Sequence, residues 1–189
     1  MDNRFSCRGF LKKEVEQKFI EQIVQVAQKV PSWCNSQPWE VTLLRPETRR
    51  LLSEKLSLSS DQAFETPDID FPKRYAGVYK TRRSICGWQL YNAVCVEKGD
   101  RKGASQQMAK NYEFFGATHV AIITTPKELG AYGVLDCGAF ITDFTLAAAA
   151  LGVSSIPQAA IAGRAPIVRK VLHIGEDRDV LCAISFGFA

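Results

Sequence analysis

The stretch Pro31-Ser-Trp-Cys-Asn-Ser-Gln-Pro-Trp39 is the most informative part of this sequence. It lies between a predicted helix, residues 14–30, whose apolar side chains recur at helical spacing, and a predicted strand, Val41–Leu44. Two prolines restrict its path, and its serine, asparagine and glutamine side chains supply hydrogen bonds. Trp39, next to the strand, is predicted to fill the core, whereas Trp33 is the better candidate for contact with a ligand. In the plainer alternative both tryptophans only pack.

Around this loop the sequence predicts many helices and few, short strands. Helices are predicted at residues 46–56, 74–98, 104–115, 134–151 and 166–173, and strands at 119–125, 154–157 and 180–186. Residues 57–72 contain two prolines and read as a loop or mobile lid. Gly152 is expected to end the preceding helix in the left-handed conformation. Neither G-x-G-x-x-G nor G-x-x-x-x-G-K-[ST] occurs, so a bound nucleotide must be held in another way.

The composition is that of an ordinary globular protein, with 46% hydrophobic and 23% charged residues and a net charge of +4. The basic residues are scattered, which argues against a nucleic-acid surface. The most apolar window, residues 138–151, contains Asp143 and is too short to span a bilayer, and the first fifteen residues hold no apolar signal segment. We therefore expect one domain, residues 1–189, soluble and cytoplasmic, without membrane or nucleic-acid partners.

The cysteines and histidines do not form a metal-binding pattern. The six cysteines show no C-x-x-C spacing, and His119 and His173 are the only histidines. No metal is expected. Cys137 and Cys182 lie in apolar runs and should act as small buried hydrophobes, and the thiols in general are expected to be reduced. Both histidines are expected to be structural.

Two further segments could bind an anion or a flat ring. Arg4, Ser6 and Arg8 alternate in an extended segment and so share one face, where two guanidinium groups and a hydroxyl could hold a phosphate. A frayed basic N-terminus is the plainer alternative. In Ser155–Ala160, small residues after a short strand leave backbone N–H groups open to a heterocycle, although an ordinary strand-to-helix connection would look the same.

Together these segments resemble the FMN-dependent nitroreductase family. The family motifs R-x-S-x-R, P-S-x-x-N-x-Q-P-W, G-x-x-x-x-P and a closing apolar strand ending in glycine are matched in order by Arg4/Ser6/Arg8, residues 31–39, Gly152/Pro157 and Ile184–Gly187. The resemblance implies an α+β fold, with a small mixed, mainly antiparallel sheet wrapped by helices, in an intertwined homodimer with two shared FMN sites. It also implies a C-terminal tail that this sequence, ending at Ala189, lacks.

The family's cofactor contacts can be carried over residue by residue. They are Arg4, Ser6 and Arg8 for the phosphate and the flavin N1/O2 edge; Pro31, Ser32, Trp33 and Asn35 from the partner subunit; Asn111 for the pyrimidine; and the turn of Pro157, Gln158, Ala159 and Ala160 for backbone N–H groups near N5. Because reduced flavin gains negative charge near N1, a cation at Arg8 would stabilise it. No side-chain acid or base is required, and no catalytic side chain is assigned.

The implied activity is transfer of hydride from NAD(P)H through FMN to a flat acceptor such as a nitroaromatic or a quinone. Trp33, Tyr75 and Tyr79 are candidates for stacking on the acceptor, whereas Trp88 is at least as suited to packing between helices. Two alternatives remain open. One is a reductive dehalogenase or flavin-degrading enzyme of the same fold; the other is a non-catalytic flavin-binding or basic interaction protein.

Overall fold

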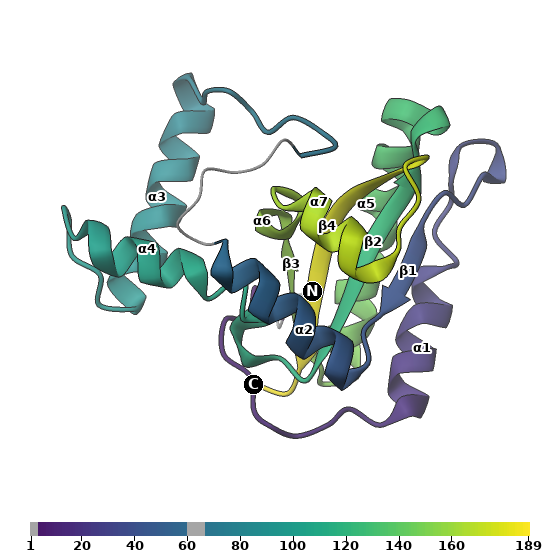
Figure 1. Ribbon diagram of the computed structural model, residues 1–189, viewed down its shortest axis with the longest axis horizontal. Coiled ribbons are helices and arrows are strands. Elements are labelled where there is room, and N and C mark those ends of the chain that lie inside the picture. Colours follow the sequence, from purple (N-terminus) through teal and green to yellow (C-terminus); the bar gives the residue numbers. More distant parts are fainter. Residues whose placement is uncertain (1–3, 60–66) are drawn as a thin grey trace.

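A four-stranded sheet lies at the centre of the computed structural model, which describes residues 4–59 and 67–189 (Figure 1). The strands are β1 (Glu40–Leu43), β2 (His119–Pro126), β3 (Ser154–Gln158) and β4 (Arg178–Gly187). They follow the order β1-β2-β4-β3, and each neighbouring pair is antiparallel. Parallel pairing enters as an isolated bridge between Ser6 and Ser155. The expected α+β fold with a small, mainly antiparallel sheet is confirmed.

Helices cover both faces of this sheet. On one face lie α1 (Gln17–Ala27) and α5 (Gly130–Ala150), and on the other lie α2 (Pro46–Leu58), α6 (Ala159–Ala162) and α7 (Ala165–Leu172). Successive side chains of β2 point to opposite faces of the sheet, so this strand contributes to both hydrophobic cores. Ala121 and Ile123 face α1 and α5, whereas Val120 and Ile122 face the layer of α2, α6 and α7. The buried strand predicted at residues 119–125 is therefore confirmed.

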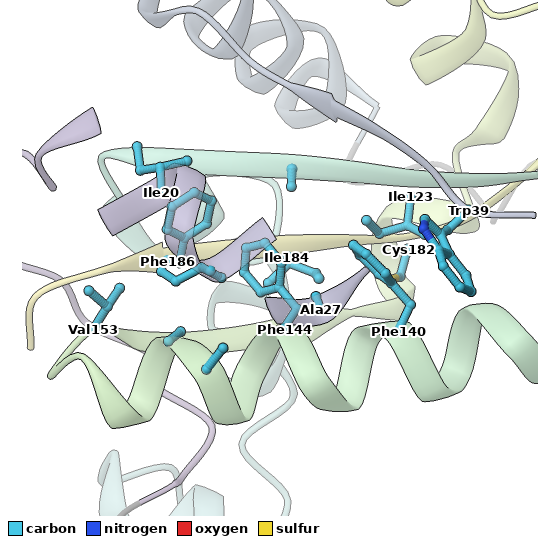
Figure 2. Close-up of a cluster of buried hydrophobic side chains, with 14 of the residues drawn as sticks. Ile20, Ala27, Trp39, Ile123, Phe140, Phe144, Val153, Cys182, Ile184 and Phe186 are labelled. Atoms are coloured by element: carbon cyan, nitrogen blue, oxygen red, sulfur yellow. The ribbon is translucent and has the colours of Figure 1, made fainter. Parts of the chain in front are cut away.

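Two phenylalanine rings of α5 hold that helix on the sheet (Figure 2). Phe140 stacks on Trp39 with ring centres 5.2 Å apart, and Phe144 meets Phe186 edge-on at 5.4 Å. Trp39 thus fills the core, as predicted. Large buried aromatics of this kind dominate core energetics. After the helix, Gly152 adopts the predicted left-handed conformation, with φ of +72°.

One face of α5 remains uncovered. Its Tyr132 and Leu135 are exposed, and the region Lys127–Ala150 is long and apolar enough, by composition alone, to cross a membrane. Its most apolar window is 44% buried, however, and it packs against α1 and the sheet. The helix therefore belongs to the core of a folded domain and carries a second, apolar surface.

An excursion made of α3 (Gly77–Ala93) and α4 (Arg101–Ala109) stands away from the sheet (Figure 1). Both helices are shorter than predicted. The second ends early because Phe114 and Phe115 turn into the core at positive φ, in a single 3₁₀ turn, instead of continuing the helix to residue 115. Part of the predicted 57–72 loop, residues 60–66, lies outside the described residues.

His119, at the start of β2, has a structural role. Its ring stacks on Phe186 at 5.3 Å, and its Nε2 accepts a hydrogen bond of 3.1 Å from the backbone N–H of Val15. Burial is the larger effect and lowers the pKa of His119 below its ordinary value of 6.5, although the Glu14 carboxylate, whose Oε2 lies 2.9 Å from the same Nε2, acts in the opposite direction. The neutral ring is therefore the form that the fold selects.

We expect the stability of the protein to fall as the pH drops from about 6.5 through this lowered pKa. In that window the unfolded histidine binds a proton that the folded one does not, so acid favours unfolding, by at most about 1.4 kcal/mol per pH unit. Urea unfolding of the wild type and of His119→Gln, followed across this pH range, measures the effect. The variant should show a shallower pH dependence; identical curves would contradict the assignment.

Candidate functional site

The segment that carries Arg4, Ser6 and Arg8 runs alongside β3. Ser6 bridges Ser155, and the N–H of the next residue, Cys7, donates to the Ser155 carbonyl at 3.1 Å. Cys7 is buried, while Arg4, Ser6 and Arg8 are exposed. From residue 4 onward this is a docked segment rather than a frayed end, and it leaves both guanidinium groups available to a ligand.

A cavity of about 500 Å³ adjoins Arg4, within the size range of small-molecule sites. Its wall comes from α5 and from the end of β3: Ile141, Thr142, Thr145, Leu146 and Pro157. One cation beside a wall of aliphatic and threonine side chains suits a flat ligand with polar edges and an anionic end. The residues present therefore fit the expected FMN.

The turn after β3 brings two predicted residues together. Gln158 is 2% exposed, and its Nε2 donates to the backbone O and the Oδ1 of Asn111, at 3.0 and 3.3 Å. The Ser185 hydroxyl donates to Gln158 Oε1. The side chain of Gln158 is thus engaged inside the fold, whereas Pro157 and Ala159 are exposed beside it. If Gln158 contacts a cofactor, it must do so through its backbone.

The loop 31–39 has a backbone that L-residues rarely adopt. Cys34, Asn35 and Gln37 all have φ between +45° and +54°. Ser32 Oγ accepts a hydrogen bond of 2.9 Å from the Gln37 N–H, and Gln37 Nε2 donates to Asn35 Oδ1 at 3.0 Å. These bonds offset the backbone strain and give the loop a defined shape.

Asp136 and Tyr132 of α5 hold this loop in place. Asp136 Oδ2 accepts the backbone N–H of Trp33 at 3.0 Å, and the Ser36 hydroxyl lies 3.5 Å from the same oxygen. The Trp33 ring, 65% exposed, sits 5.6 Å from the ring of Tyr132. Sequence reasoning missed both α5 residues. A carboxylate within a strongly apolar helix was the available signal for Asp136.

Replacing Asp136 with alanine should lower the free energy of unfolding by about 1–3 kcal/mol, because the Trp33 N–H loses its partner. Asp136→Asn keeps an oxygen acceptor and should lose less. Asp143→Ala is the matched control, since the described part of the chain shows no such hydrogen bond for that carboxylate of the same helix. Urea denaturation measures all three; equal losses for Asp136→Ala and the control would refute the proposed support of the loop.

Within one chain the Trp33 loop and the Arg4 cavity lie at different places along α5. The loop rests on Asp136, whereas the α5 residues that line the cavity run from Ile141 to Leu146, five to ten residues further on. At 1.5 Å per residue the offset along the helix is about 7–15 Å. The chain does not bring its two most informative motifs to one point.

The aromatic candidates of the excursion also lie apart from that cavity. Tyr75 and Tyr79 are exposed and do not line the Arg4 cavity. The Arg83 guanidinium lies 5.3 Å from the Tyr75 ring. Trp88 meets Tyr91 at 5.7 Å, an aromatic contact within α3 itself.

The buried cysteines behave as predicted. Cys137 and Cys182 are buried in the core between α5 and the sheet, and burial raises their pKa to about 11 and about 12. They are unreactive at neutral pH. Among the residues described, no group of three or more His, Cys, Asp or Glu side chains is placed to hold a metal ion.

This fold, a small antiparallel sheet between helical layers with a docked basic segment beside β3, defines a known class. The model of the Nitroreductase family matches residues 1–188, and the chain belongs to that family. It is 29% identical to 4-nitrobenzoate reductase of Pseudomonas putida, over 99% of this chain and 82% of that one. It is 32% identical to nitroreductase NfnB of Mycolicibacterium smegmatis, over 98% and 80%.

Solved structures give the same family. The FMN-dependent nitroreductase NfnB from Mycobacterium smegmatis, in complex with NADPH, superposes with a TM-score of 0.93 at 30% identity, covering 98% of this chain and 84% of that one. The FMN and NADPH-dependent nitroreductase NfnB from a Sphigopyxis strain gives 0.95 at 25% identity, covering 100% and 86%.

Proposed function

We propose that this protein is an FMN-dependent oxidoreductase that passes hydride from NAD(P)H to a flat acceptor such as a nitroaromatic or a quinone. The observation that carries the proposal is the cavity between α5 and the end of β3, where one exposed arginine meets a wall of aliphatic and threonine side chains. The names of the relatives support it, since one is a 4-nitrobenzoate reductase and another an FMN-dependent nitroreductase in complex with NADPH.

In this proposal the chain binds and orients, and FMN supplies the hydride chemistry when bound. Arg4 and Ser6 hold the phosphate through charge-assisted hydrogen bonds. Arg8, whose backbone lies beyond the Ser6–Ser155 bridge, stabilises negative charge on the ring edge.

Asn111, held by Gln158, offers its amide to the pyrimidine. Ala159 and Ala160, with small side chains, leave their backbone N–H groups approachable.

We further propose a homodimer in which the Trp33 loop completes the partner's site. Two observations support this: the uncovered apolar face of α5, and the offset of the loop from the Arg4 cavity along that helix. A second copy packed on α5 would cover Tyr132 and Leu135. It would also bring Trp33 and Asn35 of one chain toward Arg4 of the other. The cytoplasmic location stays a prediction.

Rapid mixing without oxygen tests the activity. The FMN-loaded protein is mixed with NADPH or NADH, and the flavin absorbance should be lost with at least one of them; addition of 4-nitrobenzoate or a quinone should then restore it. A flavin that neither nicotinamide reduces would contradict the proposal. Reoxidation by a halogenated aromatic alone would favour the dehalogenase alternative.

A further inference from the structure

Few side chains of the excursion, residues 67–110, are buried among the described residues. Its longer helix, α3, has no buried residue and stands apart from the sheet (Figure 1), and α4 buries Gln107. Its position therefore depends in large part on the points where the chain enters and leaves it. Both points lie against two arginines at α7, Arg164 and Arg169.

The entry point is fixed by Asp68. Its Oδ2 accepts hydrogen bonds from Arg169 Nη2 at 2.8 Å and from the backbone N–H of Val180 at 2.7 Å. The side chains of Arg169 and Asp68 are only 11% and 14% exposed. The pairing of β3 with β4 stops at Ala183. At Val180 that edge of β4 is therefore free of β3, and the Asp68 carboxylate binds the backbone N–H there. Breaking an ion pair of such low exposure is costly, because it leaves a charge uncompensated.

The exit point is fixed by Arg164, which is 1% exposed. Its Nη2 donates to the carbonyl of Ser59 at 2.8 Å, and its Nε lies 3.4 Å from the hydroxyl of Tyr112. Ser59 ends α2, and Tyr112 follows directly on Asn111, where the chain returns from α4. One buried guanidinium thus joins the segment before the excursion to the segment after it.

We propose that Arg164 and Arg169, with Asp68 and Tyr112, form a clamp that positions the α3–α4 excursion and, with it, the acceptor side of the site. The inference rests on the proposed function and its shared dimer site, since Tyr75 and Tyr79, the candidates for stacking on the acceptor, lie apart from the Arg4 cavity within one chain. The clamp residues are positioning residues. The turn that follows α4 also places Asn111, which adjoins Tyr112, next to Gln158.

Hydrogen exchange measures the entry point directly, on the apoprotein as well as on the FMN-loaded form. In Asp68→Ala the peptide that contains Val180 should exchange roughly ten- to a hundredfold faster, because the loss of a charge-assisted contact shifts local opening by that factor. Asp68→Asn keeps an oxygen that accepts from the Val180 N–H, so its exchange rate should lie between those of wild type and Asp68→Ala. Glu54→Ala is the control: it breaks an ion pair of 3.0 Å with Arg50 on the exposed face of α2.

Kinetics then test the role in positioning. In Asp68→Ala, and more weakly in Tyr112→Phe, the KM for the acceptor should rise while reduction of FMN by NADPH stays within about twofold of wild type. Wild-type exchange at Val180 in Asp68→Ala would overturn the clamp, and so would equal losses for NADPH and acceptor. A chain that binds no FMN would sink the proposed function and leave the exchange test standing.

Discussion

Replacing Arg4 and Arg8 together with alanine is expected to lower the affinity for FMN by about 10²- to 10⁴-fold. Each arginine supplies a charge-assisted contact of about 1.5–3 kcal/mol, and every 1.4 kcal/mol is a factor of about ten in affinity. The fold makes little other use of these side chains. Both side chains are exposed. Within the described part of the chain, the one hydrogen bond from the Arg8 guanidinium goes to the carbonyl of Ser6, at 3.3 Å.

Titration of the apoprotein, followed by quenching of FMN fluorescence, measures this loss. Arg4→Lys keeps the charge without the planar fork and should lose less than Arg4→Ala. Arg50→Ala, at an exposed position of α2, should bind like wild type. Unfolding curves for each variant show whether the domain is intact. An affinity of the double variant within about threefold of wild type would contradict the placing of the phosphate at this segment.

Mixed dimers are expected to recover a binding site that neither parent has. One chain carries Arg4→Ala and Arg8→Ala, and the other carries Trp33→Ala and Asn35→Ala. If the loop acts on the partner's site, one of the two sites in the heterodimer joins an intact Arg4 segment to an intact Trp33 loop, and the other joins the two damaged ones. We expect about one FMN per heterodimer, against almost none in either homodimer.

The two chains can be given different affinity tags, purified together and assayed for bound FMN. A loop that acts within its own chain would leave both sites of the heterodimer damaged. Flavin content no higher than in either parent would therefore contradict the shared site. In that case a single ligand would have to span the offset along α5 between Asp136 and the cavity residues Ile141–Leu146.

Much of the domain could be predicted because its signals are local. The apolar run of β2, the helical spacing before Pro31 and the glycine at position 152 each determine a conformation within a few residues. Trp39 was placed in the core by its position beside β1. The resemblance to the nitroreductases, which rests on the order of these motifs, extended the prediction to the whole chain.

The contacts that position the site could not be predicted in the same way. Asp136 and Trp33, which share a hydrogen bond, are 103 residues apart in the sequence, and Asp68 and Val180 are 112 residues apart. No local pattern carries such a pairing. The early end of α4 is a related case, since Phe114 fits helical spacing equally well but is drawn into the core beside α2. Tertiary packing decides between the two conformations.

The identity of the bound flavin tests the central claim most directly. The apoprotein is incubated with equal amounts of FMN and FAD, freed of unbound flavin, denatured and analysed by chromatography. Because the one anion clamp found suits a terminal phosphate and the sequence contains no dinucleotide loop, we predict FMN at about one molecule per chain. Retention of FAD instead, or of no flavin, would contradict the account.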